Sequence, residues 1–251
     1  MLKPAKPRTR FLPRGLVILH EDQDILVVDK PPGFLTMGTD TEKERTVYFI
    51  LTDYVRKGYS KSRNRIFIVH RLDRDASGLL IFVKSEEAKR RLQGQWPETK
   101  KTYVAVVHGR LEKPAATISS CLMENTAHRV YSTADPQKGY LSHTAYKVVQ
   151  QTRDLALLEI DLLTGRKHQI RVHLAESGHP IVGDRRYSKD GKAYKRMALH
   201  AMALSFKHPA SGKEMTFTTG VPDYFTKLMG KVEAKTVSPH PPSPPEPTIK
   251  K

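Results

Sequence analysis

Short runs of β-branched and aliphatic residues recur along the chain, and polar or turn-forming residues separate them. Runs of this kind are typical of β-strands. Stretches with apolar side chains at helical spacing intervene irregularly instead of following every strand, which argues against a strict βαβ repeat. The sequence therefore predicts an α+β fold with a mixed, mostly antiparallel sheet flanked by helices. The expected strands cover residues 16–19, 25–28, 66–69, 79–83, 102–107, 145–149, 155–162, 199–207 and 214–218, and the expected helices cover residues 46–56, 86–93, 166–175 and 221–229.

The two ends of the chain differ in composition from the middle. Residues 1–14 carry five basic side chains, three prolines and no acid, and we interpret them as a basic N-terminal arm, with a merely solubilising tail as the alternative. Residues 238–251 hold six of the 17 prolines and few apolar side chains, so this stretch cannot offset its ordering entropy. We expect a single catalytic domain over residues 15–232 and a Pro-rich disordered tail over residues 233–251.

The charge balance limits the partners of this chain. Lys and Arg total 43 against 26 Asp and Glu, which gives a net charge of +17. Such an excess favours polyanions, either nucleic acid or an anionic membrane surface. The single cysteine, Cys121, excludes an internal disulfide framework and a cysteine-based zinc cluster. No run is apolar enough for a spanning helix, and the basic start lacks the apolar stretch of a signal peptide, so we expect a soluble, cytoplasmic protein and take a monomer as the default.

Fingerprints of the common cofactor sites are missing from the sequence. There is no G-x-G-x-x-G for dinucleotides, no P-loop, no G-x-S-x-G nucleophile elbow and no H-E-x-x-H zinc motif. His168 and His173 would lie on different faces of a helix, so they are not expected to share a metal ion. We expect chemistry that needs no metal and no redox cofactor.

Three polar segments could carry chemistry, and the first is residues 70–78. It places Asp73 among several cations, between two apolar strands. A carboxylate beside cations is biased towards its ionised form, and an ionised aspartate in a cleft can act as a nucleophile or a general base. The alternative for this segment is a polar surface loop.

The second segment, residues 100–109, reads as a strand that carries Lys101 and Tyr103 on one face. A tyrosine beside a lysine could stack on a base and hold a phosphate. The alternative is an ordinary amphipathic strand.

The third segment, residues 163–173, reads as a helix that Thr164 could cap. His168, Arg171 and Ala175 would then share one face. An inward Arg171 would need a carboxylate partner, because an unpaired buried charge is very costly. A solvated basic face is the alternative. A carboxylate, an aromatic ring and an arginine on separate elements of a basic domain together suit a site that acts on a nucleotide within RNA.

At these positions the chain resembles the RluA-type pseudouridine synthases, over roughly residues 15–228. The resemblance rests on an ordered set of motifs, with Ala76 departing from the threonine usual in the family. The matching segments are Asp29-Lys30-Pro31-Pro32-Gly33, His70-Arg71-Leu72-Asp73 with Ser77-Gly78, Lys101-Thr102-Tyr103-Val104-Ala105 with Gly109, Thr164-Gly165-Arg166-Lys167-His168-Gln169-Ile170-Arg171-Val172-His173, Gly178-His179-Pro180-Ile181 with Gly183, Asp184 and Tyr187, and Leu199-His200-Ala201 with Phe206 and His208-Pro209.

The resemblance implies a pseudouridine synthase-like catalytic domain that isomerises uridine in RNA without a cofactor. It makes Asp73 the catalytic carboxylate, Arg171 its buried partner, and Tyr103 the ring that packs against the uracil. It also implies that Arg71 fills the gap left when the target base is extruded. The remaining expected substrate-binding residues are His70, Lys101, Arg166 and His168.

Two alternatives from other classes stay open at this point. One is a non-catalytic RNA-binding or ribosome-assembly protein with the same fold, and the other is a basic membrane-surface protein. Family members modify ribosomal or transfer RNA, and we favour ribosomal RNA, with transfer RNA as a close second. The polar segment 123–140 is one expected contributor to target choice, because RNA is read largely through loops and stacking.

Overall fold

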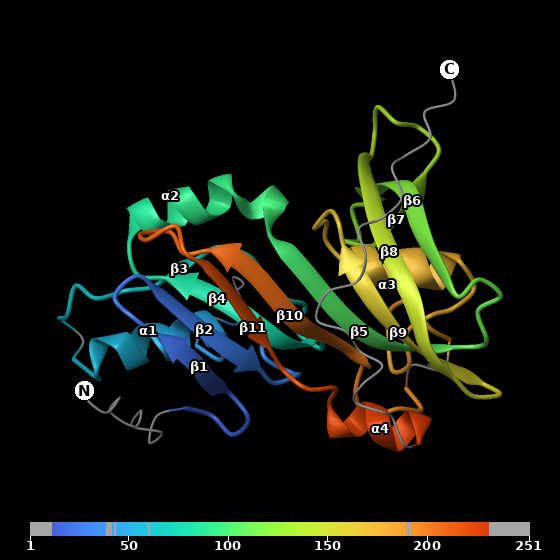
Figure 1. Ribbon diagram of the computed structural model, residues 1–251, viewed down its shortest axis with the longest axis horizontal. Coiled ribbons are helices and arrows are strands. Elements are labelled where there is room, and N and C mark those ends of the chain that lie inside the picture. Colours follow the sequence, from blue (N-terminus) through green and yellow to red (C-terminus); the bar gives the residue numbers. More distant parts are fainter. Residues whose placement is uncertain (1–11, 39–41, 43, 60, 190–191, 231–251) are drawn as a thin grey trace. The chain divides into compact units, whose positions relative to one another are not determined.

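The computed structural model describes residues 12–38, 42, 44–59, 61–189 and 192–230 (Figure 1). The chain divides into two compact units. Unit 1 comprises Met1–Lys100 and Leu199–Gly220, and unit 2 comprises Lys101–Ala198 and Val221–Lys251. The predicted tail, residues 233–251, and most of the predicted arm, residues 1–14, lie outside the described residues. The predicted domain of residues 15–232 extends over both units and stays a prediction.

Unit 1 is built on a mixed sheet, as the sequence predicts. Its strands lie in the order β1 (Val17–Glu21), β2 (Ile25–Lys30), β4 (Ser77–Val83), β10 (Leu199–Lys207) and β11 (Glu214–Thr218), and the short β3 (Phe67–Ile68) also pairs with β4. The β4–β10 pair is parallel and the other pairs are antiparallel. The predicted hairpin of residues 16–19 and 25–28 is confirmed as β1 and β2.

One face of this sheet is covered by helix α2 (Glu86–Gly94), which the sequence also predicts. Because strand side chains alternate between faces, every second residue of three adjacent strands points to the same side. Those residues of β2, β4 and β10, together with Val69 and two residues of α2, form one apolar cluster, and Trp96 of the 3₁₀ helix η2 (Trp96–Glu98) packs against it. The buried members are Ile25, Val27, Val69, Leu79, Ile81, Val83, Ala88, Leu92, Leu204 and Phe206.

Helix α1 (Val47–Arg56) confirms the helix predicted over residues 46–56. Thr46 is its N-cap, and the threonine side chain accepts a hydrogen bond from the backbone N–H of Phe49. The helix buries Val47 and Leu51. It ends at Lys57, which adopts a left-handed conformation.

Unit 2 holds an antiparallel set of strands in the order β5 (Lys100–His108), β9 (Leu155–Leu162), β8 (Tyr140–Gln151), β6 (Ala115–Glu124) and β7 (Val130–Thr133). The sequence did not predict β6 and β7. Strand β6 alternates exposed with partly buried side chains and is rich in Ala, Ser and Thr, so it lacks the apolar run by which the other strands were recognised. Helix α4 (Asp223–Met229) closes the described chain. None of the helices in the described part of the chain has the length and apolar character needed to cross a membrane.

Helix α3 (Gln169–Glu176) packs on β6 and β7 (Figure 1). Val172 of the helix forms one apolar cluster with Leu122 and Val130. The prediction that this helix begins at residue 166 is wrong, because His168 is the N-cap residue and has a left-handed φ of 53°. The prediction that Thr164 caps the helix is also wrong. Its hydroxyl donates to Oε1 of Gln169 and accepts from the backbone N–H of His143, so it joins the loop to β8 instead.

Two buried histidines tie elements together within their own units. In unit 2, His173 is hydrogen-bonded through Nδ1 to Thr144 and through Nε2 to Ser120. In unit 1, His200 is hydrogen-bonded through Nδ1 to Ser77 and through Nε2 to Thr219. Burial lowers the pKa of His173 and that of His200 to about 4.

This lowering predicts a loss of stability on mild acidification. Between a pH of about 6.5, the ordinary histidine pKa, and about 4, the unfolded chain binds protons that folded His173 and His200 do not, so stability falls as the pH is lowered. We expect the urea midpoint to drop between pH 7 and pH 5, and His173→Gln to show a shallower drop than the wild type. His128→Gln is the matched control at an exposed histidine. Equal urea midpoints at pH 7 and pH 5 would refute the lowered pKa of the two buried histidines.

Candidate active site

The segment that carries Asp73 leads from β3 to β4 in unit 1, and its backbone is held on both sides of the aspartate. On the N-terminal side, the backbone of Leu72 is held by two hydrogen bonds to Thr36. The threonine hydroxyl donates to the carbonyl oxygen of Leu72 at 2.9 Å and accepts from the Leu72 N–H at 3.1 Å. Both residues are buried, so water does not compete for these bonds.

On the C-terminal side, the carbonyl oxygen of Arg74 is held by Lys30. The ammonium of Lys30 donates to this oxygen at 3.2 Å and to the carbonyl oxygens of Pro31 and Phe34 at 3.1 and 3.0 Å. The backbone N–H of Gly33 donates to the same Arg74 oxygen at 2.8 Å. The K-P-P-G stretch therefore fixes the residue that follows Asp73.

Lys30 also sets the electrostatics of this loop. Its side chain is fully buried, and burial lowers the pKa of Lys30 to about 8, while the charges of Asp73, Asp75 and Asp29 act in the opposite direction. At neutral pH the lysine is still largely protonated. Lys30 therefore adds a buried positive charge to the electrostatic surroundings of Asp73.

The start of β4 fixes the far end of the loop. Gly78 has a φ of 111°, and a Cβ atom there would lie 2.2 Å from the carbonyl oxygen of Ala201, so no other residue fits. Ser77 is hydrogen-bonded to Nδ1 of His200 at 2.8 Å. Ala76, the departure from the family pattern, is buried at this end of the loop.

The other predicted residues of unit 1 differ in their surroundings. His70 accepts a hydrogen bond at Nε2 from the Ile81 N–H at 3.2 Å, and its ring lies 4.6 Å from that of Trp96. Both contacts tie the loop to the core of unit 1. Arg71 is exposed, which suits a side chain that is expected to enter an RNA helix.

In unit 2, Arg171 forms a buried bidentate ion pair that the sequence did not predict. Its Nε and Nη2 atoms donate to the two carboxylate oxygens of Asp184, at 2.7 and 2.8 Å. The same carboxylate accepts the backbone N–H groups of Arg186 and Tyr187. Burial alone would raise the pKa of Asp184, but the hydrogen bonds and charge of Arg171, together with those two N–H groups, lower it.

Tyr187 joins this ion pair to a second predicted residue. The Arg171 guanidinium lies 5.1 Å from the centre of the Tyr187 ring, and the Tyr187 hydroxyl is hydrogen-bonded to Nδ1 of His168 at 2.9 Å. Unit 2 therefore brings Arg171 and His168 together around one tyrosine. Sequence reasoning missed these roles of Asp184 and Tyr187, although both residues continue the motif that contains Arg171.

The expected pairing of Arg171 with Asp73 stays a prediction, because the two residues belong to different units. Unit 2 also holds Lys101 and Tyr103, which share one face of β5. Tyr103 is nearly buried, and burial lowers the pKa of Lys101 to about 8. Unit 1 therefore contributes His70, Arg71 and Asp73, and unit 2 contributes Lys101, Tyr103, Arg166, His168 and Arg171.

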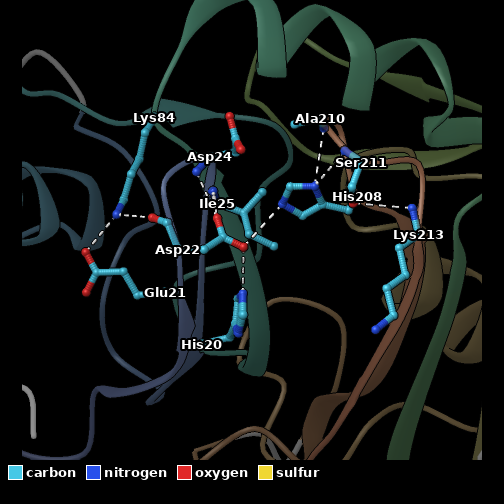
Figure 2. Close-up of polar contacts among 10 residues, drawn as sticks. All are labelled: His20, Glu21, Asp22, Asp24, Ile25, Lys84, His208, Ala210, Ser211 and Lys213. Atoms are coloured by element: carbon cyan, nitrogen blue, oxygen red, sulfur yellow. Dashed lines mark hydrogen bonds and ion pairs between the residues drawn. The ribbon is translucent and has the colours of Figure 1, made fainter. Parts of the chain in front are cut away.

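Away from these residues, Asp22, Asp24 and His208 offer three potential metal ligands within 4.8 Å of one another in unit 1. Figure 2 shows that His208 accepts two backbone N–H groups of the following turn at Nδ1, so its proton is on Nε2, where the ring meets Asp22 at 3.2 Å. Asp22 also bonds His20 and two backbone N–H groups. A protonated ring nitrogen cannot ligate a metal, so this cluster fits a hydrogen-bonded tie between the β1–β2 hairpin and the turn after β10.

Comparison with known proteins agrees with the motifs. Residues 24–176 match the family described as RNA pseudouridylate synthase. The chain is 34% identical over 220 residues to an uncharacterised RNA pseudouridine synthase of Mycoplasma genitalium, covering 85% of this chain and 69% of that one. It is 36% identical over 213 residues to ribosomal large subunit pseudouridine synthase C of Salmonella typhimurium, covering 79% of this chain and 64% of that one.

A solved structure also resembles this chain. The human RNA pseudouridylate synthase domain containing 1 aligns with a TM-score of 0.68 and 25% identity, over 90% of this chain and 89% of the human one. The curated relatives are longer, and the chain spans about two thirds of their length. The family match includes both the Asp73 loop and the Arg171 helix. The chain therefore belongs to the RNA pseudouridylate synthase family and is an isomerase that converts uridine in RNA to pseudouridine.

Proposed function

We propose that this enzyme isomerises specific uridines of structured RNA, with ribosomal RNA as the first expected substrate and transfer RNA as the second, and that Asp73 is essential to the chemistry. The observation that carries the proposal is the double clamp on the Asp73 loop. Thr36 and Lys30 hold the residues on either side of the aspartate from distant parts of the chain. Buried polar groups are committed there to placing one carboxylate, which is typical of a catalytic site.

The reaction breaks the bond between C1′ of the ribose and N1 of the uracil, turns the base, and forms a bond from C1′ to C5. The hydrogen on C5 leaves as a proton, and N1 gains one, so substrate and product are isomers and no electrons are transferred. The Asp73 carboxylate has three routes in this scheme. It attacks the sugar, attacks the base, or removes a proton from the ribose.

The other residues supply binding and orientation in this proposal. Tyr103 packs against the uracil, and Arg171 pairs with Asp73 as well as with Asp184. The target base is flipped out of the RNA, and Arg71 occupies the space it leaves, which offsets part of the few kcal/mol that flipping costs. His70, Lys101, Arg166 and His168 complete the expected substrate-binding set.

One observation favours ribosomal RNA over transfer RNA, and a second supports RNA in general. A Salmonella typhimurium relative at 36% identity bears the name ribosomal large subunit pseudouridine synthase C. The net charge of +17 also suits a large polyanion.

A proton-release assay tests this activity directly. RNA transcribed with uridine tritiated at C5 loses tritium to water when the new glycosidic bond forms at C5. We expect release from ribosomal RNA transcripts, and less from a transfer RNA pool. RNA binding without any release would favour the non-catalytic RNA-binding alternative.

The basic surface predicts a steep dependence of RNA affinity on salt. Lys and Arg side chains displace counterions from RNA, with a slope of roughly −0.7 in log affinity per phosphate contact on single strands. We expect affinity for ribosomal RNA to fall at least about tenfold between ~50 and ~200 mM salt, which corresponds to roughly two or three such contacts. A titration that gives equal affinity at both concentrations would remove the basic surface as the binding site.

A further inference from the structure

An exposed aromatic side chain in unit 2 lies against an arginine from another segment. Tyr140 is the first residue of β8, and its side chain is 66% exposed. The guanidinium of Arg166, in the loop before α3, lies 4.7 Å from the centre of the Tyr140 ring. At this distance the cation interacts with the face of the ring. The pair stands on the surface, where burial alone does not explain it.

The position of Tyr140 is fixed by its backbone. A Cβ atom on the preceding Gly139 would lie 2.7 Å from the Thr133 side chain and 2.9 Å from that of Cys121, so β8 begins in close contact with β6 and β7. Tyr140 pairs with Leu122 in the β6–β8 ladder, and its carbonyl oxygen accepts the hydroxyl of Ser142. The ring is therefore presented from a strand that is paired with β6.

Arg166 is also held in place by a buried group. Gln169 accepts the backbone N–H of Arg166 at 3.1 Å and donates to the carbonyl oxygen of His143 and the hydroxyl of Thr144. One buried amide thus fastens the arginine loop to the strand that carries Tyr140. Both members of the pair are preorganised, which lowers the entropy cost of binding a ligand.

The charge of Arg166 is open to a ligand. In the described part of the chain no carboxylate forms an ion pair with Arg166, whereas its neighbour Lys167 is paired with Glu124.

Two further apolar side chains of unit 2 are exposed nearby, Leu141 at 57% and Leu163 at 40%. They lie on neighbouring chain segments, since the N–H of His143 donates to the hydroxyl of Thr164.

We propose that Tyr140 and Arg166 form a binding subsite for an unpaired nucleotide of the substrate RNA other than the reacting uridine. The base stacks on the open side of the Tyr140 ring, and a neighbouring phosphate pairs with the Arg166 guanidinium. The target uracil itself needs an enclosing pocket, so an exposed ring is suited to a flanking nucleotide. This inference rests on the proposed function, because it assumes that the bound polymer is RNA.

RNA fits this pair better than a protein surface does. A ring and an unpaired guanidinium side by side match the two parts of a nucleotide, the base and the phosphate, and stacking on aromatic side chains is how proteins commonly hold unpaired bases. The net charge of +17 adds attraction for a polyanion.

Binding of a fluorescein-labelled oligouridine of about 12 nucleotides tests the subsite without knowledge of the natural target. We expect Tyr140→Ala to bind about tenfold more weakly than the wild type, and Tyr140→Phe to bind within about twofold of it, because the stacking ring is retained. The matched control is Phe49→Ala, which removes a 47% exposed aromatic side chain from unit 1 and is expected to leave the affinity unchanged.

Salt dependence separates the two halves of the subsite. Arg166→Gln is expected to lower the slope of log affinity against log salt by about 0.7, one phosphate contact, and Tyr140→Ala is expected to leave the slope as it is. In the wild type, photo-cross-linking to an oligouridine that contains 4-thiouridine is expected to label the peptide with Tyr140. Because the cross-linking experiment uses the wild type, it tests the subsite even if a variant does not fold.

Wild-type affinity in Tyr140→Ala, or a cross-link confined to other peptides, would overturn the subsite and leave a protein partner as the better explanation of the exposed pair. The outcome is distinguishable from failure of the proposed function. If the wild type binds the oligouridine through Tyr140 but releases no tritium from ribosomal RNA transcripts, the subsite stands and the enzyme activity alone is refuted.

Discussion

Replacement of Asp73 by asparagine is expected to reduce tritium release from ribosomal RNA transcripts by at least about 10³-fold, because nucleophilic or general-base chemistry at a positioned carboxylate is lost. The asparagine has nearly the same size, and Thr36 and Lys30 bind the backbone of the neighbouring residues and not the Asp73 side chain. The backbone of the loop should therefore keep its shape, and binding of oligouridine should be unchanged.

The matched control for this variant is Asp75→Asn. Asp75 is an exposed aspartate of the same loop, two positions further along the chain. It also contributes to the negative field around Lys30. We expect Asp75→Asn to keep activity within a few-fold of the wild type. Equal losses in both variants would mean that the loop needs negative charge in general and that Asp73 has no chemical role of its own.

The second large effect concerns the ion pair of Arg171 with Asp184. Both side chains are buried, and Asp184→Asn would leave the guanidinium without its bidentate partner. Breaking a buried pair by removal of one member typically costs about 3–5 kcal/mol. We expect a loss of this size in the free energy of unfolding, measured with urea at pH 7. The exposed pair of Arg91 with Glu87 is the matched control, where Glu87→Gln should cost less than about 1 kcal/mol.

The acid dependence of this ion pair has a definite sign. The pKa of Asp184 is lowered in the folded protein. The ion pair therefore contributes its full stabilisation above the ordinary aspartate pKa of about 4. This stabilisation is lost as the pH falls through the lower pKa of the folded protein. The difference between wild type and Asp184→Asn should therefore shrink below pH ~4. A cost below about 1 kcal/mol at pH 7 would show that the pair is not what holds Arg171 in place.

Much of the fold could be predicted because apolar runs mark buried strands. Strands β9, β10 and β11 lie at the predicted residues, and α1 begins one residue after the predicted start of that helix, residue 46. Strand β6 was missed because it alternates exposed with partly buried side chains and has no apolar run. The start of α3 was misplaced because Thr164, which has the chemistry of a cap, bonds a side chain and another strand.

The candidate site, like the fold, could be predicted from the sequence only in part. The sequence points to Asp73, Tyr103 and Arg171 through residue chemistry and motif resemblance. It does not reveal the contacts that place them, because these join residues far apart in the chain. Thr36 and Leu72 are 36 positions apart, and Lys30 and Arg74 are 44 apart. Asp184 was recognisable as part of a motif, but its pairing with Arg171 follows only from the folded geometry.

Pseudouridine mapping on total RNA, from cells with and without this gene and from cells rescued with wild type or Asp73→Ala, tests the central claim most directly. We expect at least one uridine, in ribosomal RNA first, to lose its modification without the gene. The wild type should restore it and Asp73→Ala should not. An unchanged map, or full restoration by Asp73→Ala, would contradict an Asp73-dependent pseudouridine synthase.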